Sequence, residues 1–273
     1  MDVSYHKGHA RNLGRDMEYK RYGHAGRPVV VFPTSQGRFY QFEDSGGVAA
    51  LADFIDTGRI QLFTLDGIDS ESFFDKHADA AHRIARHEAY FRYVREEALP
   101  ELQAVAAKAN GGRSLKPLFC GCSMGGYHSS NFVFRFPELA SGVISLSGVY
   151  SARDFFGRTL EGNIYFNSPL DYLPGIVDQK LLGRLRALRL IFCCGQGAWE
   201  ERMLVETRKL EQILRDKSIP AWVDYWGGDV SHDWPWWHKQ LVYFFGRWLD
   251  DDLMHRLDYD HTRSHPPLCR GHQ

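Results

Sequence analysis

The sequence predicts an α/β fold with a mostly parallel central sheet and helices on both of its faces. Short apolar segments recur along the chain, at residues 28–33, 60–65, 117–122, 142–146, 188–193 and 221–226. Segments with helical periodicity lie between several of them, at residues 87–107, 127–136 and 200–216. Strands that are apolar on both faces and alternate with helices are typical of a parallel sheet covered on both sides. No internal repeat is visible, which excludes solenoids and propellers.

The individual elements follow from local patterns. Residues 28–33 read Pro-Val-Val-Val-Phe-Pro, a run without polar alternation that is typical of a buried strand. Residues 17–22 alternate between polar and apolar side chains, which predicts an antiparallel edge strand. The helix over residues 87–107 contains Pro100, so we expect an interruption near that residue.

Composition and charge exclude several classes of protein. With 44% hydrophobic residues in 273, the chain can bury a large core. Its 33 Lys and Arg balance 34 Asp and Glu, and no stretch concentrates basic residues, so we expect no nucleic-acid partner. The N-terminus lacks the apolar segment of a signal peptide, and no apolar run reaches the roughly 20 residues of a membrane span. We therefore expect a soluble, cytoplasmic protein that does not bind membranes.

The cysteines and histidines do not suggest a metal site. Of five cysteines, Cys120, Cys122, Cys193 and Cys194 lie in apolar runs, which predicts reduced, buried thiols. No Cys-x-x-Cys pair occurs, and the histidines near the C-terminus are irregularly spaced. We expect neither a metal nor an organic cofactor.

We expect a single domain over residues 1–257. Residues 151–180 are rich in Gly, Asn, Pro and aromatic side chains, which favours an insertion or lid over the sheet. Residues 258–273 have the composition of a surface or disordered tail. The sequence leaves the oligomeric state open, with a homo-oligomer as one alternative.

The motif Gly-Cys-Ser-Met-Gly at residues 121–125 follows an apolar strand and precedes a helical segment. A serine at such a strand-to-helix turn adopts a strained backbone and needs small neighbours, which Gly121 and Gly125 supply. The turn presents the Ser123 hydroxyl above the carboxyl end of the sheet. It also directs the Met124 N–H, at the positive end of the helix dipole, to the same place. The motif predicts a nucleophile and half of an oxyanion hole.

A serine nucleophile needs a histidine base. The expected order along the chain is serine, then the acid, then the histidine. His232 lies a few residues after the last predicted strand, at a turn where Pro235 suits the first position of a helix and nearby indoles can fix the imidazole. For His238 we expect a surface or packing position. For His128, inside the helix after Ser123, we expect buried packing or pocket lining.

The acid is expected in the loop after the strand at residues 188–193, where Glu200 and Glu201 are the first carboxylates. We choose Glu200. Both glutamates also suit the first turn of the next helix because of its dipole. Glu201, Asp224 and Asp229 remain alternatives.

Four segments together, at residues 13–19, 32–37, 121–126 and 232–237, resemble the esterase D-like branch of the α/β-hydrolases. The resemblance covers most of the chain and implies the α/β-hydrolase fold. It also implies that His232 is the catalytic base and that a backbone N–H after the strand ending at Phe32 is the second oxyanion donor. That donor would be Ser35, with Thr34 or Gln36 as neighbours. Relatives often carry aspartate in the acid loop, where this chain has Glu200.

These observations favour a serine esterase that acts through an acyl-enzyme, without a cofactor, on a small-molecule ester. The aromatic residues of 151–180 and four indoles near the predicted triad favour a short or aromatic, uncharged ester. The alternatives are an acyltransferase of the same fold, or a catalytically silent binding protein that retains it.

Overall fold

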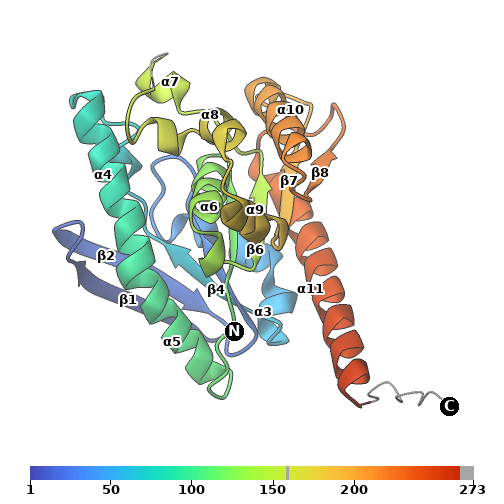
Figure 1. Cartoon of the computed structure of the whole chain (residues 1–273). Helices are drawn as coiled ribbons and strands as arrows, with labels where there is room; N and C mark the ends of the chain where they lie inside the picture. Colours follow the sequence, from blue (N-terminus) through green and yellow to red (C-terminus); the bar gives the residue numbers. More distant parts are fainter. Residues whose placement is uncertain (158–159, 265–273) are drawn as a thin grey trace.

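The computed structural model describes residues 1–157 and 160–264 and contains one eight-stranded sheet in the order β1-β2-β4-β3-β5-β6-β7-β8 (Figure 1). Strands β3 to β8 are parallel to one another, and β2 is antiparallel to β4. This arrangement confirms the predicted fold class. The strands are β1 Val3–Ala10, β2 Arg15–Tyr22, β3 Arg27–Val31, β4 Ile60–Leu65, β5 Leu118–Cys122, β6 Gly142–Leu146, β7 Arg189–Cys194 and β8 Trp222–Tyr225.

The segment predicted as an antiparallel edge strand is β2. It is antiparallel, but the prediction that it lies at the edge of the sheet is wrong. Strand β1 lies outside it, antiparallel, in a register from Val3 opposite Tyr22 to Ala10 opposite Arg15. Most β1 side chains are exposed or half-buried, so the strand carries no apolar run by which the sequence could reveal it. Its packing comes from contacts such as the His6 ring stacked on Tyr19, with 4.4 Å between ring centroids.

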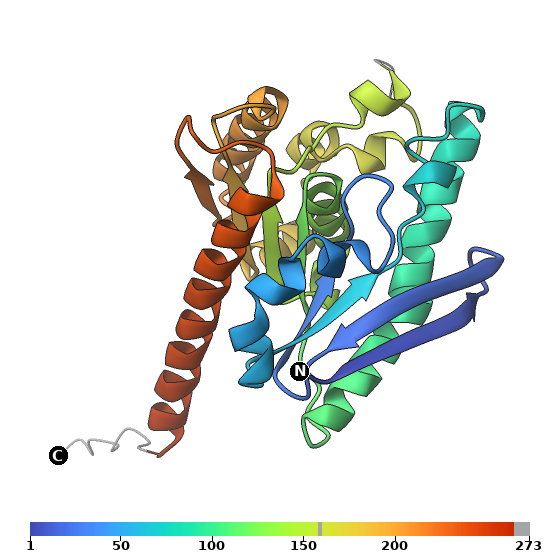
Figure 2. The same cartoon turned by 180° about the vertical axis from the view of Figure 1, so that it is seen from behind.

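Alternate residues of the central strands supply two separate cores. In β3 and the residue after it, Val30 and Phe32 face one core, whereas Val29 and Val31 face the other. Helices cover both faces, as Figures 1 and 2 show from opposite sides. The first core contains residues of α4 Ala80–Tyr93, α5 Leu99–Ala109, α6 Met124–Arg135, α9 Gln179–Arg186 and α10 Glu201–Asp216. The second contains residues of α1 Gln41–Asp44, α2 Gly47–Ala50, α3 Ala52–Asp56 and α11 Trp234–Ser264.

The helix predicted over residues 87–107 is interrupted by a π-helical turn. This turn, η2 Val94–Ala98, joins α4 to α5, and Pro100 follows in the first turn of α5. A proline has no N–H to donate, and its ring clashes with the carbonyl four residues earlier. The wider turn adapts to both effects, so the helix continues beyond the proline.

The predicted insertion contains α7 Arg153–Phe156, η4 Tyr165–Asn167, α8 Pro169–Tyr172 and η5 Leu173–Gly175, and its last residues begin α9. Helices α7 and α8 lie at the upper end of the molecule in Figure 1, between the top of α4 and α10. Glu206 of α10 fixes the start of the insertion, because its carboxylate accepts the N–H groups of Tyr150 and Ser151 at 2.5 and 2.9 Å. Whether the segment acts as a lid stays a prediction.

The C-terminal helix α11 continues to Ser264, beyond the predicted domain end at residue 257. The sequence contains no proline between Pro235 and Pro266, and a residue before proline disfavours helical backbone, so the helix can extend to this point. The rest of the predicted tail, residues 265–273, lies outside the described residues. Among the described helices, none has the length and apolar composition of a membrane span.

The buried imidazole of His87 on α4 makes the stability of the fold depend on pH. Its side chain is fully buried, and burial, together with the charges of His128 and Arg135, lowers the pKa of His87 well below the usual value of about 6.5. The unfolded chain therefore binds a proton below about pH 6.5 that the folded chain does not bind. Stability contributed by neutral His87 is full above that pH and is lost as the pH falls.

We expect the free energy of unfolding to fall below about pH 6.5 by up to about 1.4 kcal/mol per pH unit from this residue. Denaturant unfolding of the wild type and of His87→Phe, measured across the acidic range, checks this expectation. The variant has no imidazole at this position, so its unfolding should take up as much as one proton less. The free energy of unfolding of the variant should therefore fall less steeply as the pH is lowered. Equal slopes in the two proteins would contradict it.

Candidate active site

Ser123 lies in the turn between β5 and α6, with φ 54° and ψ −122°. The neighbouring glycines are required by close packing. A Cβ atom on Gly121 would lie 2.3 Å from the carbonyl carbon of Gly125, and one on Gly125 would lie 2.4 Å from the oxygen of Phe32. The predicted strained serine between two space-making glycines is therefore confirmed. The Ser123 N–H donates to the oxygen of Leu146 at 2.8 Å, which fixes the turn against β6.

The imidazole of His232 lies beside Ser123, with 2.9 Å between Nε2 and the serine Oγ. Its backbone N–H donates to the oxygen of Ala198 at 3.0 Å, so the histidine loop is attached to the acid loop. The ring of Trp237 packs edge-on against the imidazole, with 4.9 Å between centroids and 83° between planes. The structure therefore brings the predicted nucleophile and the predicted base within hydrogen-bond distance.

Glu200 lies on the other side of the imidazole, with 3.4 Å between its Oε2 and Nδ1 of His232. Glu200 is fully buried and lies directly before α10. The loop that carries it is tight. A Cβ on Gly195 would lie 2.2 Å from the oxygen of Val230, and Trp199 has φ 69° with 78% of its surface exposed. The loop thus turns Glu200 inward and Trp199 outward.

Two further groups hold the Glu200 carboxylate. Ser147 donates from its Oγ to Glu200 Oε1 at 2.5 Å and accepts from the indole N–H of Trp237 at 3.0 Å. The Cys194 thiol lies 3.4 Å from Oε2 and 3.2 Å from the oxygen of Gly195, and burial and the nearby carboxylate raise the pKa of Cys194 and keep it protonated. All of these residues lie at or just beyond the carboxyl ends of strands, apart from Trp237 in α11.

Sequence reasoning missed Ser147. It follows β6 with φ 50°, in the left-handed region that a residue other than glycine seldom adopts. Its N–H donates to the oxygen of Cys193 at 2.7 Å, and this contact holds the unusual backbone. The available signal was positional: polar side chains just beyond the carboxyl ends of parallel strands gather at one edge of the sheet.

The alternative acids lie elsewhere. Glu201 is exposed at the start of α10, and Asp229 is exposed on its loop. The Asp224 carboxylate accepts from the indole N–H of Trp226 at 3.3 Å. Of the four carboxylates considered, the structure places only Glu200 beside His232.

The two other histidines that the sequence singled out have structural contacts. His238 of α11 donates from Nε2 to the oxygen of Ser45 at 2.7 Å. His128 is 2% exposed, and its Nε2 lies 2.8 Å from Oδ1 of Asp69. His128 is thus buried, as expected, and neither histidine has a hydrogen bond to Ser123 within the described residues.

Between Thr34 and Gln36, the loop after β3 leaves a backbone donor unused. The Thr34 N–H donates to Oε1 of Gln41 at 2.9 Å, and the Gln36 N–H donates to Oδ2 of Asp69 at 3.2 Å. Within the described part of the chain, the N–H of Ser35 between them has no hydrogen-bond partner. The N–H of Met124 also lacks an intrahelical partner, because it belongs to the first residue of α6.

An apolar cluster also lies near the site. This cluster next to Ser123 contains buried Phe73, Met124 and Met203, with Phe155 and Phe156 of the insertion partly buried against it.

The four free cysteines of the described residues, Cys120, Cys122, Cys193 and Cys194, are all buried, as predicted. Across residues 1–157 and 160–264, no three His, Cys, Asp or Glu side chains group as metal ligands would.

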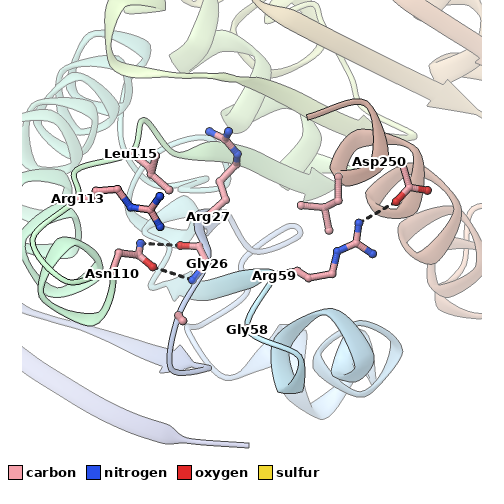
Figure 3. A pocket seen from close by; sticks show the side chains of 10 residues that line it. Gly26, Arg27, Gly58, Arg59, Asn110, Arg113, Leu115 and Asp250 are labelled. Carbon is pink, nitrogen blue, oxygen red and sulfur yellow. Dashed lines mark hydrogen bonds and ion pairs between the residues drawn. The ribbon is translucent and has the colours of Figure 1, made fainter. Parts of the chain in front are cut away.

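A cavity of about 460 Å³ lies at the opposite edge of the sheet, where β3 and β4 begin (Figure 3). Figure 3 shows Arg113 and Asn110 on one side of this cavity and Arg59 on the other, with Arg27 between them. Asn110 exchanges two hydrogen bonds with the backbone of Gly26, and Arg59 pairs with Asp250 at 2.8 Å. Its lining contains no paired nucleophile and base, so the candidate site is the one at Ser123.

The sheet order, the strained serine turn and the histidine and carboxylate beside it define an α/β-hydrolase fold with a serine-hydrolase site. The family model described as "Putative esterase" matches residues 13–247, which is most of the chain. The chain belongs to this family, which confirms the resemblance seen in the sequence. Its class of enzyme is that of a serine esterase, a carboxylic ester hydrolase.

Three solved structures with the same fold share 13–17% of their sequence with this chain. A ferulic acid esterase has a TM-score of 0.67 at 17% identity, covering 88% of this chain and 95% of its own. A fluorophosphonate-binding serine hydrolase of Staphylococcus aureus has a TM-score of 0.67 at 13% identity, covering 91% and 98%. An S-formylglutathione hydrolase of Agrobacterium tumefaciens has a TM-score of 0.63 at 13% identity, covering 92% and 93%. No functionally curated protein matches the chain in sequence.

Proposed function

We propose that the protein hydrolyses a short or aromatic, uncharged carboxylic ester through an acyl-enzyme on Ser123. The observation that carries this proposal is the 2.9 Å contact between Ser123 Oγ and His232 Nε2. It lies at the carboxyl end of β5, in a turn where the backbone of Ser123 is strained, with a positive φ. Glu200 would orient His232 through Nδ1 and balance the charge of the imidazolium.

The reaction proceeds in two halves. Ser123 Oγ attacks the ester carbonyl while its proton passes to His232 Nε2. The oxyanion that forms accepts hydrogen bonds from the N–H groups of Met124 and Ser35. The imidazolium then gives the proton to the leaving alcohol oxygen as the carbon–oxygen bond breaks. A water molecule attacks the acyl-enzyme, with His232 taking its proton and returning it to Ser123. No step in this scheme calls on a cofactor.

The preference for short or aromatic acyl groups rests on the surroundings of the serine. The cluster around Met124 contains partly buried Phe155, Phe156 and Tyr225, whereas Trp199 of the acid loop is 78% exposed. Of the other indoles, Trp237 supports the imidazole, and the Lys239 amino group lies 4.0 Å from the centre of the Trp236 ring. The aromatic groups available to substrate are therefore fewer than the sequence suggested.

The substrate class is tested with straight-chain nitrophenyl esters of increasing acyl length, a feruloyl ester, and a glutathione thioester as a charged comparison. We expect the highest kcat/KM for acyl groups of two to four carbons or for the feruloyl group. A kcat/KM still rising at eight carbons, or highest for the thioester, would contradict the assignment. Adding alcohol or thiol acceptors distinguishes hydrolysis from acyl transfer, since a transferase would form the exchanged ester.

A further inference from the structure

A buried carboxylate links the helix that follows Ser123 to the loop that carries Ser35. Asp69 belongs to η1 Asp69–Glu71, in the connection between β4 and α4. Its Oδ1 lies 2.8 Å from Nε2 of His128 on α6, and its Oδ2 accepts the Gln36 N–H at 3.2 Å. Asp69 is 4% exposed and His128 is 2% exposed, so water hardly competes for these bonds.

The contact to Gln36 fixes an otherwise unfavourable backbone. Gln36 has φ 57°, a conformation that a residue other than glycine seldom adopts unless its surroundings hold it. The residue before Ser35 is also fixed, because Gln41 binds both the N–H and the hydroxyl of Thr34. The Ser35 peptide thus lies between two anchored neighbours, with its own N–H unused by the described residues.

The contact to His128 connects this loop to the second donor. His128 lies four residues after Met124, about one turn further along α6, so the two positions move together as parts of one helix. The connection is reinforced at Gly67, where a Cβ would lie 2.7 Å from the oxygen of Gly37. The backbone near Asp69 therefore packs directly against the loop after β3.

We propose that Asp69 and His128 are a positioning pair that sets the Ser35 N–H relative to the Met124 N–H and so shapes the oxyanion hole. This inference rests on the proposed function, in which those two groups stabilise the oxyanion. Neither side chain touches the reacting atoms. Their effect passes through the backbone of Gln36 on one side and through α6 on the other.

The pair is tested by its effect on turnover per active site. The end-point of fluorophosphonate labelling counts folded, competent sites, and kcat is divided by that count, so a loss of folded protein does not lower the result. Asp69→Ala removes both bonds, Asp69→Asn leaves one acceptor oxygen for two donors, and His128→Phe removes the ring donor while keeping a ring. His128→Gln retains an N–H near the position of Nε2.

We expect kcat per site to fall about 10- to 100-fold in Asp69→Ala and His128→Phe, with KM little changed, because a misplaced donor weakens transition-state binding. The losses in Asp69→Asn and His128→Gln should be smaller. The affinity for a trifluoromethyl ketone, which forms an oxyanion on the serine, should fall in parallel with kcat/KM. The matched control is His87→Phe, since its ring packs against His128 without a hydrogen bond to the loop.

Two results would overturn the inference, and they are distinguishable. If the wild type is labelled at Ser123 and hydrolyses esters, but Asp69→Ala and His128→Phe keep kcat per site within about twofold of His87→Phe, the pair only supports the fold. If the wild type shows no labelling that depends on Ser123, the proposed function fails, and this inference fails with it.

Discussion

Ser123→Ala should reduce ester turnover by about four orders of magnitude or more while leaving the fold intact. The substitution removes the attacking oxygen and the hydrogen-bond partner of His232 Nε2, which lies 2.9 Å away. It leaves the Met124 and Ser35 N–H groups in place, so the residual rate would come from binding and the oxyanion hole. Turnover of a short nitrophenyl ester and covalent labelling by a fluorophosphonate measure the loss.

The matched control is Ser129→Ala on the same helix. Ser129 is fully buried, and its hydroxyl has no hydrogen-bond partner in the described residues, so its removal is also a one-atom change, within α6. This variant should label and turn over like the wild type, and both variants should keep the wild-type circular dichroism spectrum. If Ser123→Ala retained labelling and most of its turnover, a different nucleophile would have to be sought.

The central part of the fold was predictable because it depends on local patterns. The strands β3 to β7 are buried on both faces or nearly so, and such strands require apolar runs that are visible in the sequence. The turn at Ser123 was predictable for a similar reason, because steric contact at Gly121 and Gly125 restricts the residues that fit there. In both cases, neighbours in the sequence carry the physical cause.

Other features depend on residues far apart in the sequence. Ser147 reaches Glu200 across 53 positions, and Asp69 reaches His128 across 59 and Gln36 across 33. Each of these side chains is an ordinary polar residue in its local context, and its role depends on how the sheet brings loops together. Strand β1 was missed for a related reason, because an exposed edge strand is defined by its pairing with β2.

The identity of the acid lies between these two cases. Its loop could be predicted, because the acid of this fold follows a particular strand, but the loop offers two adjacent glutamates. The backbone distinguishes them. The left-handed conformation of Trp199 reverses the chain, so Glu200 is buried toward His232 and Glu201 is exposed in the first turn of α10. Glutamate is one methylene longer than aspartate, and here its carboxylate lies 3.4 Å from Nδ1 of His232.

Glu200→Gln should therefore lower kcat by about 10³- to 10⁴-fold, whereas Glu201→Gln should change it less than about twofold. The amide offers a donor where His232 needs an acceptor, which favours the wrong imidazole tautomer, and it cannot balance the imidazolium charge. Both substitutions remove one charge from adjacent positions, so the general effect of charge cancels in the comparison. Active-site titration with a fluorophosphonate again normalises the rates.

The comparison of Glu200→Gln with Glu201→Gln can also contradict this assignment. A large loss in Glu201→Gln with little change in Glu200→Gln would transfer the role to Glu201. Small losses in both would show that neither glutamate is needed to orient His232, even though Glu200 is the carboxylate that the structure places beside it.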